Sequence, residues 1–310
     1  MKLVYFGSGE FGLPTLDRLA AEHTVALVVT PPDRPAGRSR RPRAAPVRLW
    51  AQDHSVKTLQ VADVNDDSAI RRIHAAGADG LVVIAFGQKL GPALLAGTFA
   101  VNLHASLLPK YRGAAPVNWA IINGEAETGV SVIRITQRID AGDILAQRAT
   151  AIDTMETAGE LECRLAEIGA PVVLETLANF QRGRLQPTPQ DERLATRAPK
   201  LAKDQGTVRF DQPAGHVQSR VHGLTPWPGC RVRLDGRPLR LARVEVGGEV
   251  GGVEAPGAGE PGVLLDDRSV ACATGTVRLL EVQPPGGKVM SFSSYCHGHP
   301  VSAGARVQPL

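Results

Sequence analysis

Residues 97–113 carry the sequence GTFAVNLHASLLPKYRG. The apolar start of this stretch predicts a short buried strand over residues 97–104, and the proline and glycine that follow predict a loop. Alternate residues of a strand point to the same side, so we expect Asn102 and His104 to lie together where this strand ends. Ligands of open α/β sheets bind at the carboxyl ends of the strands. The stretch therefore predicts a strand of an α/β sheet and the edge at which its chemistry takes place.

A single aspartate, Asp140, lies downstream in the turn IDAGD, residues 139–143. An imidazole such as that of His104 can relay a proton while a carboxylate fixes its tautomer and supports its charge. The side-chain amide of Asn102 supplies N–H donors for an oxygen that becomes negative as a carbonyl turns tetrahedral. An amine can attack such a carbonyl directly, so no serine or cysteine nucleophile is required. These three residue types together indicate transfer of an acyl group to an amine.

The first half of the chain alternates between strand-like and helix-like segments. The predicted elements are strands over Lys2–Gly7, His23–Thr30 and Leu81–Phe86 and helices over Pro14–Glu22 and Asp66–Ala76. A longer helix is expected from the capping box that opens at Thr157, through Phe180, to a stop at Gly183. This order predicts an α/β fold with a Rossmann-like, doubly wound and mostly parallel sheet.

The second half of the chain changes character at residue 185. Prolines among polar residues predict a linker over residues 185–205, and short strand-like runs between Gly and Pro turns follow it. These runs are Val208–Phe210, Arg231–Leu234, Arg240–Val246, Gly262–Leu265, Ser269–Ala273 and Val277–Gln283. Their spacing predicts a small β-barrel. The expected organisation is a catalytic domain over residues 1–184, the linker, and a barrel domain over residues 206–310.

Composition favours a two-domain cytoplasmic enzyme. At 310 residues the chain exceeds the size of one ordinary core, and its net charge of +4 permits a polyanionic partner without requiring one. The four cysteines show no paired spacing, so reduced thiols are expected. No apolar run approaches the roughly 20 residues of a membrane span, and residues 1–6 enter a strand without a signal region. The tract Cys296-His297-Gly298-His299 lacks the partner pair of a closed metal site, so no metal is expected.

Two stretches carry a resemblance to a known family. Residues 102–116, NLHASLLPKYRGAAP, and residues 129–142 resemble the two halves of the signature of folate-dependent formyltransferases. The resemblance implies that Asn102, His104 and Asp140 form the catalytic set, and the 38-residue separation between Asn102 and Asp140 matches the family. Gln137-Arg138 departs from the acidic or apolar residue that is usual before the turn.

The resemblance also implies a substrate pair and a second domain. It implies transfer of the formyl group of 10-formyltetrahydrofolate, as co-substrate, to the amino group of methionine on initiator methionyl-tRNA, with an OB-like C-terminal barrel and a monomeric protein. In that family Phe11 borders the aminoacyl pocket. The positions that correspond to folate contacts are Phe86, Gly87, Gln88, Leu90, Ser106, Leu107, Leu108, Pro109, Ile139 and Asp143.

A basic segment, residues 31–43, contains five arginines among prolines that prevent a helix. The segment is expected to be extended and exposed, which is also typical of a passive solvated loop. Arginine clusters beside an active site attract phosphate backbones, and residues 32–38 resemble the insertion that distinguishes the tRNA-acting branch. The tRNA contacts expected from this reasoning and from the Gly-Lys segment of the barrel are Arg34, Arg38, Arg40, Arg41 and Lys288.

Three alternatives stay open at this point. The motif GSGEFG, residues 7–12, follows a strand and precedes Asp33 by about twenty residues, as in nicotinamide-dependent dehydrogenases. However, Leu13-Pro14 delays the helix and no second cofactor signal appears. A formyltransferase that acts on a nucleotide-linked amino sugar shares the Asn-x-His and Ser-Leu-Leu-Pro patterns. A noncatalytic RNA-binding barrel joined to an inactive α/β domain is the third alternative, and the complete catalytic set argues against it.

Overall fold

The computed structural model describes residues 1–36, 41–247, 249–250, 253–254 and 259–310, and the chain forms two compact units. The larger unit comprises Met1–Gly113, Gly129–Thr150 and Glu162–Arg197, and the smaller unit comprises Ala114–Thr128, Ala151–Leu161 and Ala198–Leu310. Two short segments from within the predicted 1–184 range therefore pack with the C-terminal residues. The boundaries at 184 and 205 stay a prediction.

A seven-stranded sheet forms the centre of the larger unit. Its order is β10 (Ile144–Ala151), β9 (Glu127–Arg134), β7 (Phe99–His104), β6 (Gly80–Ile84), β1 (Lys2–Gly7), β2 (Thr24–Thr30) and β5 (Thr58–Gln60). The strands from β7 to β5 are parallel, and β9 runs antiparallel to β7. Every residue of β6 is buried, as expected of a strand that is covered on both faces. The prediction of a doubly wound, mostly parallel sheet is confirmed.

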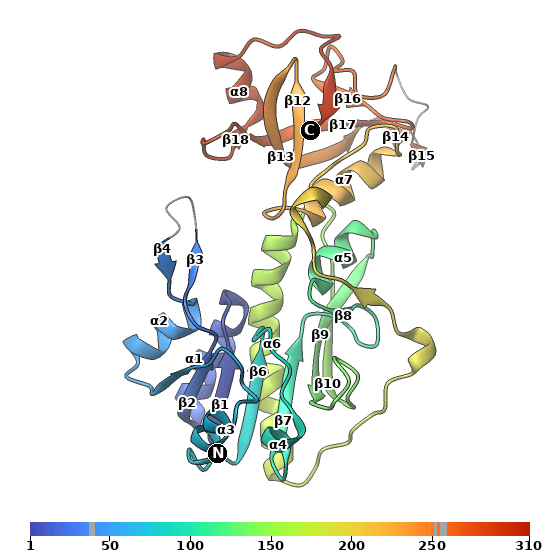
Figure 1. Cartoon of the computed structure of the whole chain (residues 1–310). Helices are drawn as coiled ribbons and strands as arrows, with labels where there is room; N and C mark the ends of the chain where they lie inside the picture. The colour runs from blue at the N-terminus through green and yellow to red at the C-terminus, as the bar shows by residue number, and fades with distance from the viewer. Residues whose placement is uncertain (37–40, 248, 251–252, 255–258) are drawn as a thin grey trace. The chain divides into compact units, whose positions relative to one another are not determined.

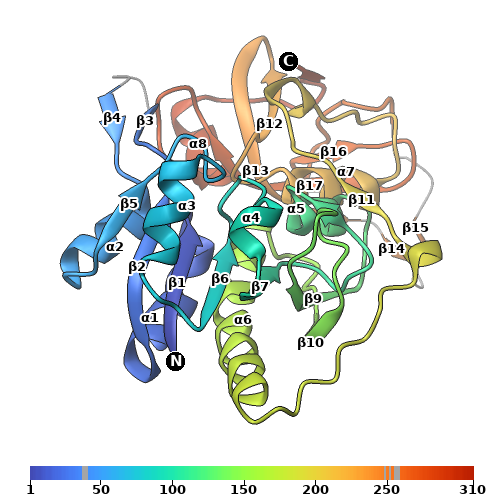
Figure 2. The ribbon, with the colours of Figure 1, turned by 60° about the horizontal axis from the view of Figure 1, so that its bottom comes forward.

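Helices cover both faces of this sheet. They are α1 (Leu13–Glu22), α2 (Pro46–Asp53), α3 (Asp67–His74), α4 (Pro92–Leu95) and α6 (Ala158–Gln181). Ile73 of α3 and Leu94 of α4 share one apolar cluster with the strand residue Phe6, and Figure 2 shows both helices over the strands. Helix α6 runs along the sheet in Figure 1, with Gly169 so close to Leu103 of β7 that a Cβ would lie 2.6 Å from a Leu103 methyl group. None of the described helices is long and apolar enough to cross a membrane.

The start of α6 follows the predicted capping box. The Thr157 N–H and hydroxyl both donate to the Glu160 carboxylate at 2.8 Å. This contact satisfies a backbone donor that the first turn of the helix leaves unpaired. At the other end Gly183 has φ of +64°, the left-handed conformation that ends helices and favours glycine. The longest helix of the chain is thus bounded by local signals.

Short elements connect the sheet to its loops. They are η1 (Glu10–Gly12), β3 (Arg34–Ala36), β4 (Arg41–Arg43), β8 (Arg112–Gly113), η2 (Glu192–Leu194), β11 (Arg197–Ala198) and η3 (Lys203–Gln205). Strands β3 and β4 pair antiparallel, with Arg34 opposite Arg43. The basic segment is therefore a paired hairpin on either side of residues 37–40. The predicted contacts Arg38 and Arg40 lie outside the described residues.

The smaller unit contains an antiparallel sheet of OB-like character. Its order is β16 (Ser269–Ala271), β17 (Thr276–Gln283), β13 (Arg237–Gly247), β12 (Cys230–Leu234) and β19 (Val307–Pro309), with β18 (Met290–Ser291) beside β17 and a separate pair of β14 (Glu249–Val250) and β15 (Val253–Glu254). The helices are α5 (Pro116–Ile122), α7 (Ala214–Gly223) and α8 (Phe292–Gly298). Their apolar residues join the sheet residues in one core that includes Val217, Val232 and Phe292.

Two strands expected in this unit are absent from the described residues. Residues 208–210 form no strand, because Val208 and Phe210 are buried in the core from an irregular segment and not from a ladder. Residues 262–265 make only isolated bridges, from Val263 to Arg306 and from Leu264 to Val270. Alternating apolar residues mark burial in both cases, and burial alone does not require pairing.

Candidate active site

The carboxyl end of β7 presents Asn102 and His104. Asn102 lies in the interior of the sheet, opposite Val83 of β6 and Ile133 of β9. His104 follows two residues later, on the same side of the strand, and only 6% of it is exposed. Within the described part of the chain the side-chain amide of Asn102 makes no hydrogen bond, so its donors are available to a ligand.

The two nitrogens of the His104 ring have different neighbours. Nε2 lies 2.9 Å from the carbonyl oxygen of Tyr111, which can only accept, so Nε2 carries a hydrogen and donates. Nδ1 faces the carboxylate of Asp140, with 3.7 Å between Nδ1 and Oδ2. Because Nε2 is bound to the Tyr111 carbonyl, Nδ1 is the ring nitrogen that is available for proton transfer, and it lies on the side of the Asp140 carboxylate.

Asp140 is held in an unfavourable backbone conformation. Its φ is +52°, a region that residues with a Cβ seldom occupy. The carboxylate oxygen Oδ2 accepts the Gly113 N–H at 2.9 Å, and the side chain is 13% exposed. The neighbouring Ile139 is 67% exposed, while Asp143 contributes its backbone carbonyl to the Arg134 N–H at 2.9 Å. The turn thus directs its carboxylate inward and its isoleucine outward.

The Ser-Leu-Leu-Pro loop is held by polar groups of its own and of strands β9 and β10. The buried Ser106 hydroxyl donates to the Lys110 carbonyl at 2.7 Å, and the Leu108 N–H donates to the Ser131 hydroxyl at 3.0 Å. Gln147 of β10 donates to the Leu108 carbonyl at 2.9 Å. Ser106 and Leu108 are buried, whereas Leu107 and Pro109 are half-buried. The predicted folate contacts of this loop therefore divide into two buried residues that hold it and two that remain accessible.

The predicted folate stretch 86–90 uses most of its side chains within the fold. Phe86 packs edge-on against Phe6, with ring centroids 5.5 Å apart, and Leu90 lies in the same core cluster. The Gln88 side chain accepts the Val64 N–H at 2.8 Å and donates to the Val61 carbonyl. Gly87 has φ of +80°. A ligand along this stretch would meet backbone groups more than side chains.

The glycine-rich turn has a packing explanation. A Cβ on Gly12 would lie 1.9 Å from the Tyr5 hydroxyl oxygen, so the glycine makes room for a fully buried tyrosine whose pKa is raised by burial. Asp33, the acidic residue of the nucleotide fingerprint, is already paired with Arg48 and accepts a hydrogen bond from Gln60 at 2.8 Å. Neither feature therefore needs a dinucleotide. Phe11, which directly precedes Gly12 in the same turn, is buried, with 8% of it exposed.

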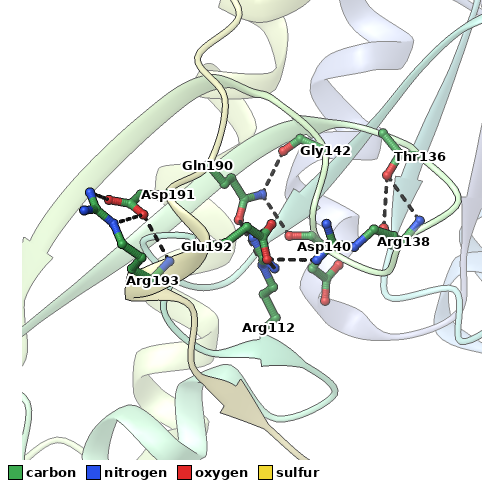
Figure 3. A network of polar contacts seen from close by, with 9 residues as sticks. All are labelled: Arg112, Thr136, Arg138, Asp140, Gly142, Gln190, Asp191, Glu192 and Arg193. Atoms are coloured by element: carbon green, nitrogen blue, oxygen red, sulfur yellow. Dashed lines mark hydrogen bonds and ion pairs between the residues drawn. The ribbon is translucent and has the colours of Figure 1, made fainter.

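Part of this site comes from residues 185–205, a segment that the sequence predicts to be only a linker. Figure 3 shows that Gln190 and Glu192 from this segment reach the loops that carry Asp140 and Arg112. Thr196 joins them, since its hydroxyl accepts the Tyr111 N–H at 2.8 Å. Polar residues among prolines look like any surface connection, and no local pattern distinguishes these side chains.

The expected tRNA contacts are only partly visible. Arg34 is the first residue of β3 and Arg41 is the first residue of β4. Lys288 is exposed between β17 and β18. Cys296 and His299 belong to α8 and its end, and no group of three or more His, Cys, Asp and Glu in the described ranges could hold a metal ion.

Comparison with protein families matches both parts of the chain. Residues 1–177 match the family described as formyl transferase, and residues 200–300 match the one described as formyl transferase, C-terminal domain. A protein of Heliobacterium modesticaldum named methionyl-tRNA formyltransferase is 41% identical over 318 residues, which cover 99% of this chain and 99% of that protein.

Solved structures share the fold at lower identity. The structure of HypX from Aquifex aeolicus in complex with tetrahydrofolic acid matches this chain with a TM-score of 0.58 and 22% identity. The match covers 82% of this chain and 45% of the HypX chain. WlaRD, a sugar 3N-formyl transferase, has a TM-score of 0.65 and 15% identity, over 89% of this chain and 96% of that one. At these identities the likeness shows the fold alone.

Proposed function

The chain belongs to the formyl transferase family, and we propose that it transfers the formyl group of 10-formyltetrahydrofolate to the amino group of methionine carried on initiator tRNA. The observation that carries the proposal is the meeting of two loops at the end of β7. There Nδ1 of His104 lies 3.7 Å from the Asp140 carboxylate, and Asn102, two residues earlier on the same side of β7, makes no side-chain hydrogen bond among the described residues.

The proposed mechanism uses each of these three side chains. The amine nitrogen forms a bond to the formyl carbon, and the carbonyl oxygen becomes negative as the carbon turns tetrahedral. The N–H groups of Asn102, with a proton on His104, stabilise that oxygen. Asp140 orients His104 and assists removal of the proton from the attacking amine. The bond from the formyl carbon to N10 of the folate then breaks, and N10 receives a proton.

The proposed folate site lies along residues 86–90 and the loops at 106–109 and 139–143. Backbone N–H and carbonyl groups beside Gly87 suit the donor and acceptor edge of a pterin, because the side chains there pack into the fold. Leu107, Pro109 and exposed Ile139 supply apolar surface beside the catalytic carboxylate. The aminoacyl group is proposed to lie near Phe11.

The proposed acceptor is a tRNA and not a nucleotide-linked amino sugar. The supporting observation is that similarity to methionyl-tRNA formyltransferases extends over nearly the whole chain, including the C-terminal domain. The residues proposed to contact phosphates are Arg34, Arg38, Arg40, Arg41 and Lys288. A cytoplasmic, monomeric enzyme fits this acceptor, since translation supplies it there.

Arg38 offers a specific check of the acceptor. Arg38→Ala is expected to weaken tRNA binding while folate affinity stays unchanged, and to reduce the salt dependence of tRNA binding by a slope of about 1, as for one lost phosphate contact. Dissociation constants of parent and variant across a salt series measure both effects. Unchanged tRNA affinity and salt slope would remove this arginine from the proposed interface.

A direct assay tests the function itself. Purified protein is incubated with 10-formyltetrahydrofolate and either initiator methionyl-tRNA or a nucleotide-linked amino sugar, and His104→Ala protein serves as the inactive control. Formylmethionyl-tRNA formed by the parent alone is the expected result. Formylation of the sugar with none of the tRNA would replace the proposal with the amino-sugar alternative.

A further inference from the structure

We propose that Gln190 is a positioning residue, whose side-chain amide holds the Asp140 turn so that its carboxylate faces His104. This inference rests on the proposed function of the site. It concerns residues 188–196, a segment far from the catalytic loops in sequence, and Figure 3 shows the contacts on which it depends.

The turn needs an external support. Asp140 has a left-handed φ of +52°, and such a conformation persists in a residue with a Cβ only where the surroundings hold it. Gln190 Nε2 donates to the Asp140 carbonyl at 2.8 Å and to the Gly142 carbonyl at 2.7 Å. One amide group therefore binds the backbone on both sides of Ala141. Loss of these bonds frees the rotation that aims the carboxylate.

Arg112 fixes which way the Gln190 amide points. The guanidinium donates through Nε at 3.0 Å and through Nη2 at 2.7 Å to Gln190 Oε1. Arginine has donors and no acceptor, so the amide oxygen must face it. The NH2 group is thereby directed at the two carbonyls of the turn. Both hydrogens of the amide and its oxygen are used, which makes a flipped amide unfavourable.

Glu192 anchors Arg112 in turn. Its carboxylate accepts two hydrogen bonds from Arg112 at 3.0 Å each, and a third from Arg138 at 2.8 Å. Hydrogen bonds from Arg112 and then Arg138 lower the pKa of Glu192 to about 2, so this anchor stays ionised at neutral pH. Arg138, which departs from the family pattern, thus joins the same network from the Asp140 loop.

The network ends at the catalytic carboxylate. Arg112 immediately precedes Gly113, whose N–H donates to Asp140 Oδ2 at 2.9 Å. Residues 112–113 therefore hold the turn twice, through the Arg112 side chain by way of Gln190 and through the Gly113 backbone. These contacts fix the carboxylate at 3.7 Å from His104 Nδ1.

The substitution Gln190→Glu tests whether Gln190 positions the Asp140 turn or only contributes to the stability of the fold. The variant keeps an oxygen for Arg112 but places a second oxygen, in place of the NH2 group, against two carbonyls. We expect kcat for formyl transfer to fall by about 10- to 100-fold, since misplacing a catalytic group by about 1 Å costs that much, with KM for both substrates little changed. Asp191→Asn and Arg193→Gln are matched controls, because the half-buried Asp191 and the exposed Arg193 of the same segment bond each other and not the turn.

A second measurement does not depend on the reaction. Exchange of the Gly113 amide hydrogen reports its bond to Asp140, and we expect faster exchange in Gln190→Glu than in the parent and the two controls, with an unchanged midpoint of thermal unfolding. Gly113 exchange and kcat equal to those of the controls would overturn the inference, as would a kcat loss matched by a general loss of stability. A parent without formyl transfer activity would instead refute the proposed function, and Gly113 exchange would still test Gln190.

Discussion

Among the residues that the structure describes, each unit contains one buried histidine, and the two rings have different neighbours. His222 of the smaller unit is 1% exposed, and both of its nitrogens bind backbone: Nε2 accepts the Val244 N–H and Nδ1 donates to the Thr154 carbonyl, at 3.2 Å each. His104 of the larger unit binds backbone through Nε2 alone. Its other nitrogen faces a carboxylate beyond hydrogen-bond distance.

We interpret this difference as the one between a structural histidine and a histidine that takes part in the proposed chemistry. A ring whose two nitrogens are both bound to backbone joins chain segments and has no proton to exchange with a ligand. A ring with one nitrogen held and one facing Asp140 is oriented, yet keeps a position for proton transfer. The expected consequence is that changes at His104 affect rate and changes at His222 affect stability.

The largest effect is expected at His104. His104→Ala should reduce formyl transfer by ~10²–10³, or about 2–4 kcal/mol of barrier, because an acid–base or oxyanion group is lost from the transition state. Asn102→Asp should be comparably damaging, since it replaces a donor with a negative charge. Single-turnover rates and thermal unfolding curves, measured together, check both variants. Near-parental turnover in His104→Ala would abolish the distinction between the two rings.

At His222 the expected effect is on stability at acid pH. Burial first, and then the positive charge of Arg243, lower the pKa of this imidazole to about 4. The unfolded chain takes up a proton near pH 6.5, and the folded chain does so only near pH 4. Above pH 6.5 this histidine therefore costs the folded state nothing. As the pH falls towards 4, the free energy of unfolding decreases by up to about 3 kcal/mol.

His222→Gln provides the comparison for that window. The neutral amide can bind the same backbone groups without titrating, so the unfolding free energy of the variant should vary less between pH 6.5 and 4. Denaturant unfolding at several pH values measures the slope. An equally steep slope in the variant would assign the acid sensitivity to other groups.

A smaller effect is expected at Arg243, the charge beside His222. Its guanidinium donates to the Met155 carbonyl and pairs with Glu160 at 2.5 Å and Glu281 at 3.2 Å, all within the smaller unit. Arg243→Met should cost about 1–2 kcal/mol of stability and raise the pKa of His222, which shrinks the acid-dependent loss. Calorimetry at pH 7 and pH 5 measures the loss of stability and its dependence on pH. We expect kcat at saturating tRNA to be unchanged. A fall in kcat without a loss of stability would place Arg243 in the chemistry.

Local signals in the sequence account for most of the larger unit. The apolar run before Asn102 predicts β7, and the Thr157–Glu160 pattern predicts the start of α6, because in each case the interacting residues are neighbours in the chain. Helix α7 is missing from the prediction, although Ala214, Val217 and Val221 recur at helical spacing. The glycines at both ends of so short a pattern weaken it.

The support of the Asp140 turn could not be predicted in this way. Gln190 lies 50 residues from Asp140 in the sequence, and it reaches the turn from irregular backbone that has no periodicity. The left-handed conformation of Asp140 likewise has no local signal, since nothing in IDAGD requires it at the aspartate. The resemblance predicts which residues react, whereas only the folded chain shows which contacts hold them in place.

Asp140→Asn tests most directly the claim that this carboxylate takes part in formyl transfer. Asparagine retains the shape of the side chain and an oxygen for the Gly113 N–H, and it replaces the negative charge that faces His104 with a neutral amide. Single-turnover transfer from 10-formyltetrahydrofolate to initiator methionyl-tRNA is predicted to slow by ~10²–10³ while the thermal unfolding midpoint stays at that of the parent. A variant that transfers formyl groups at the parental rate would contradict the account.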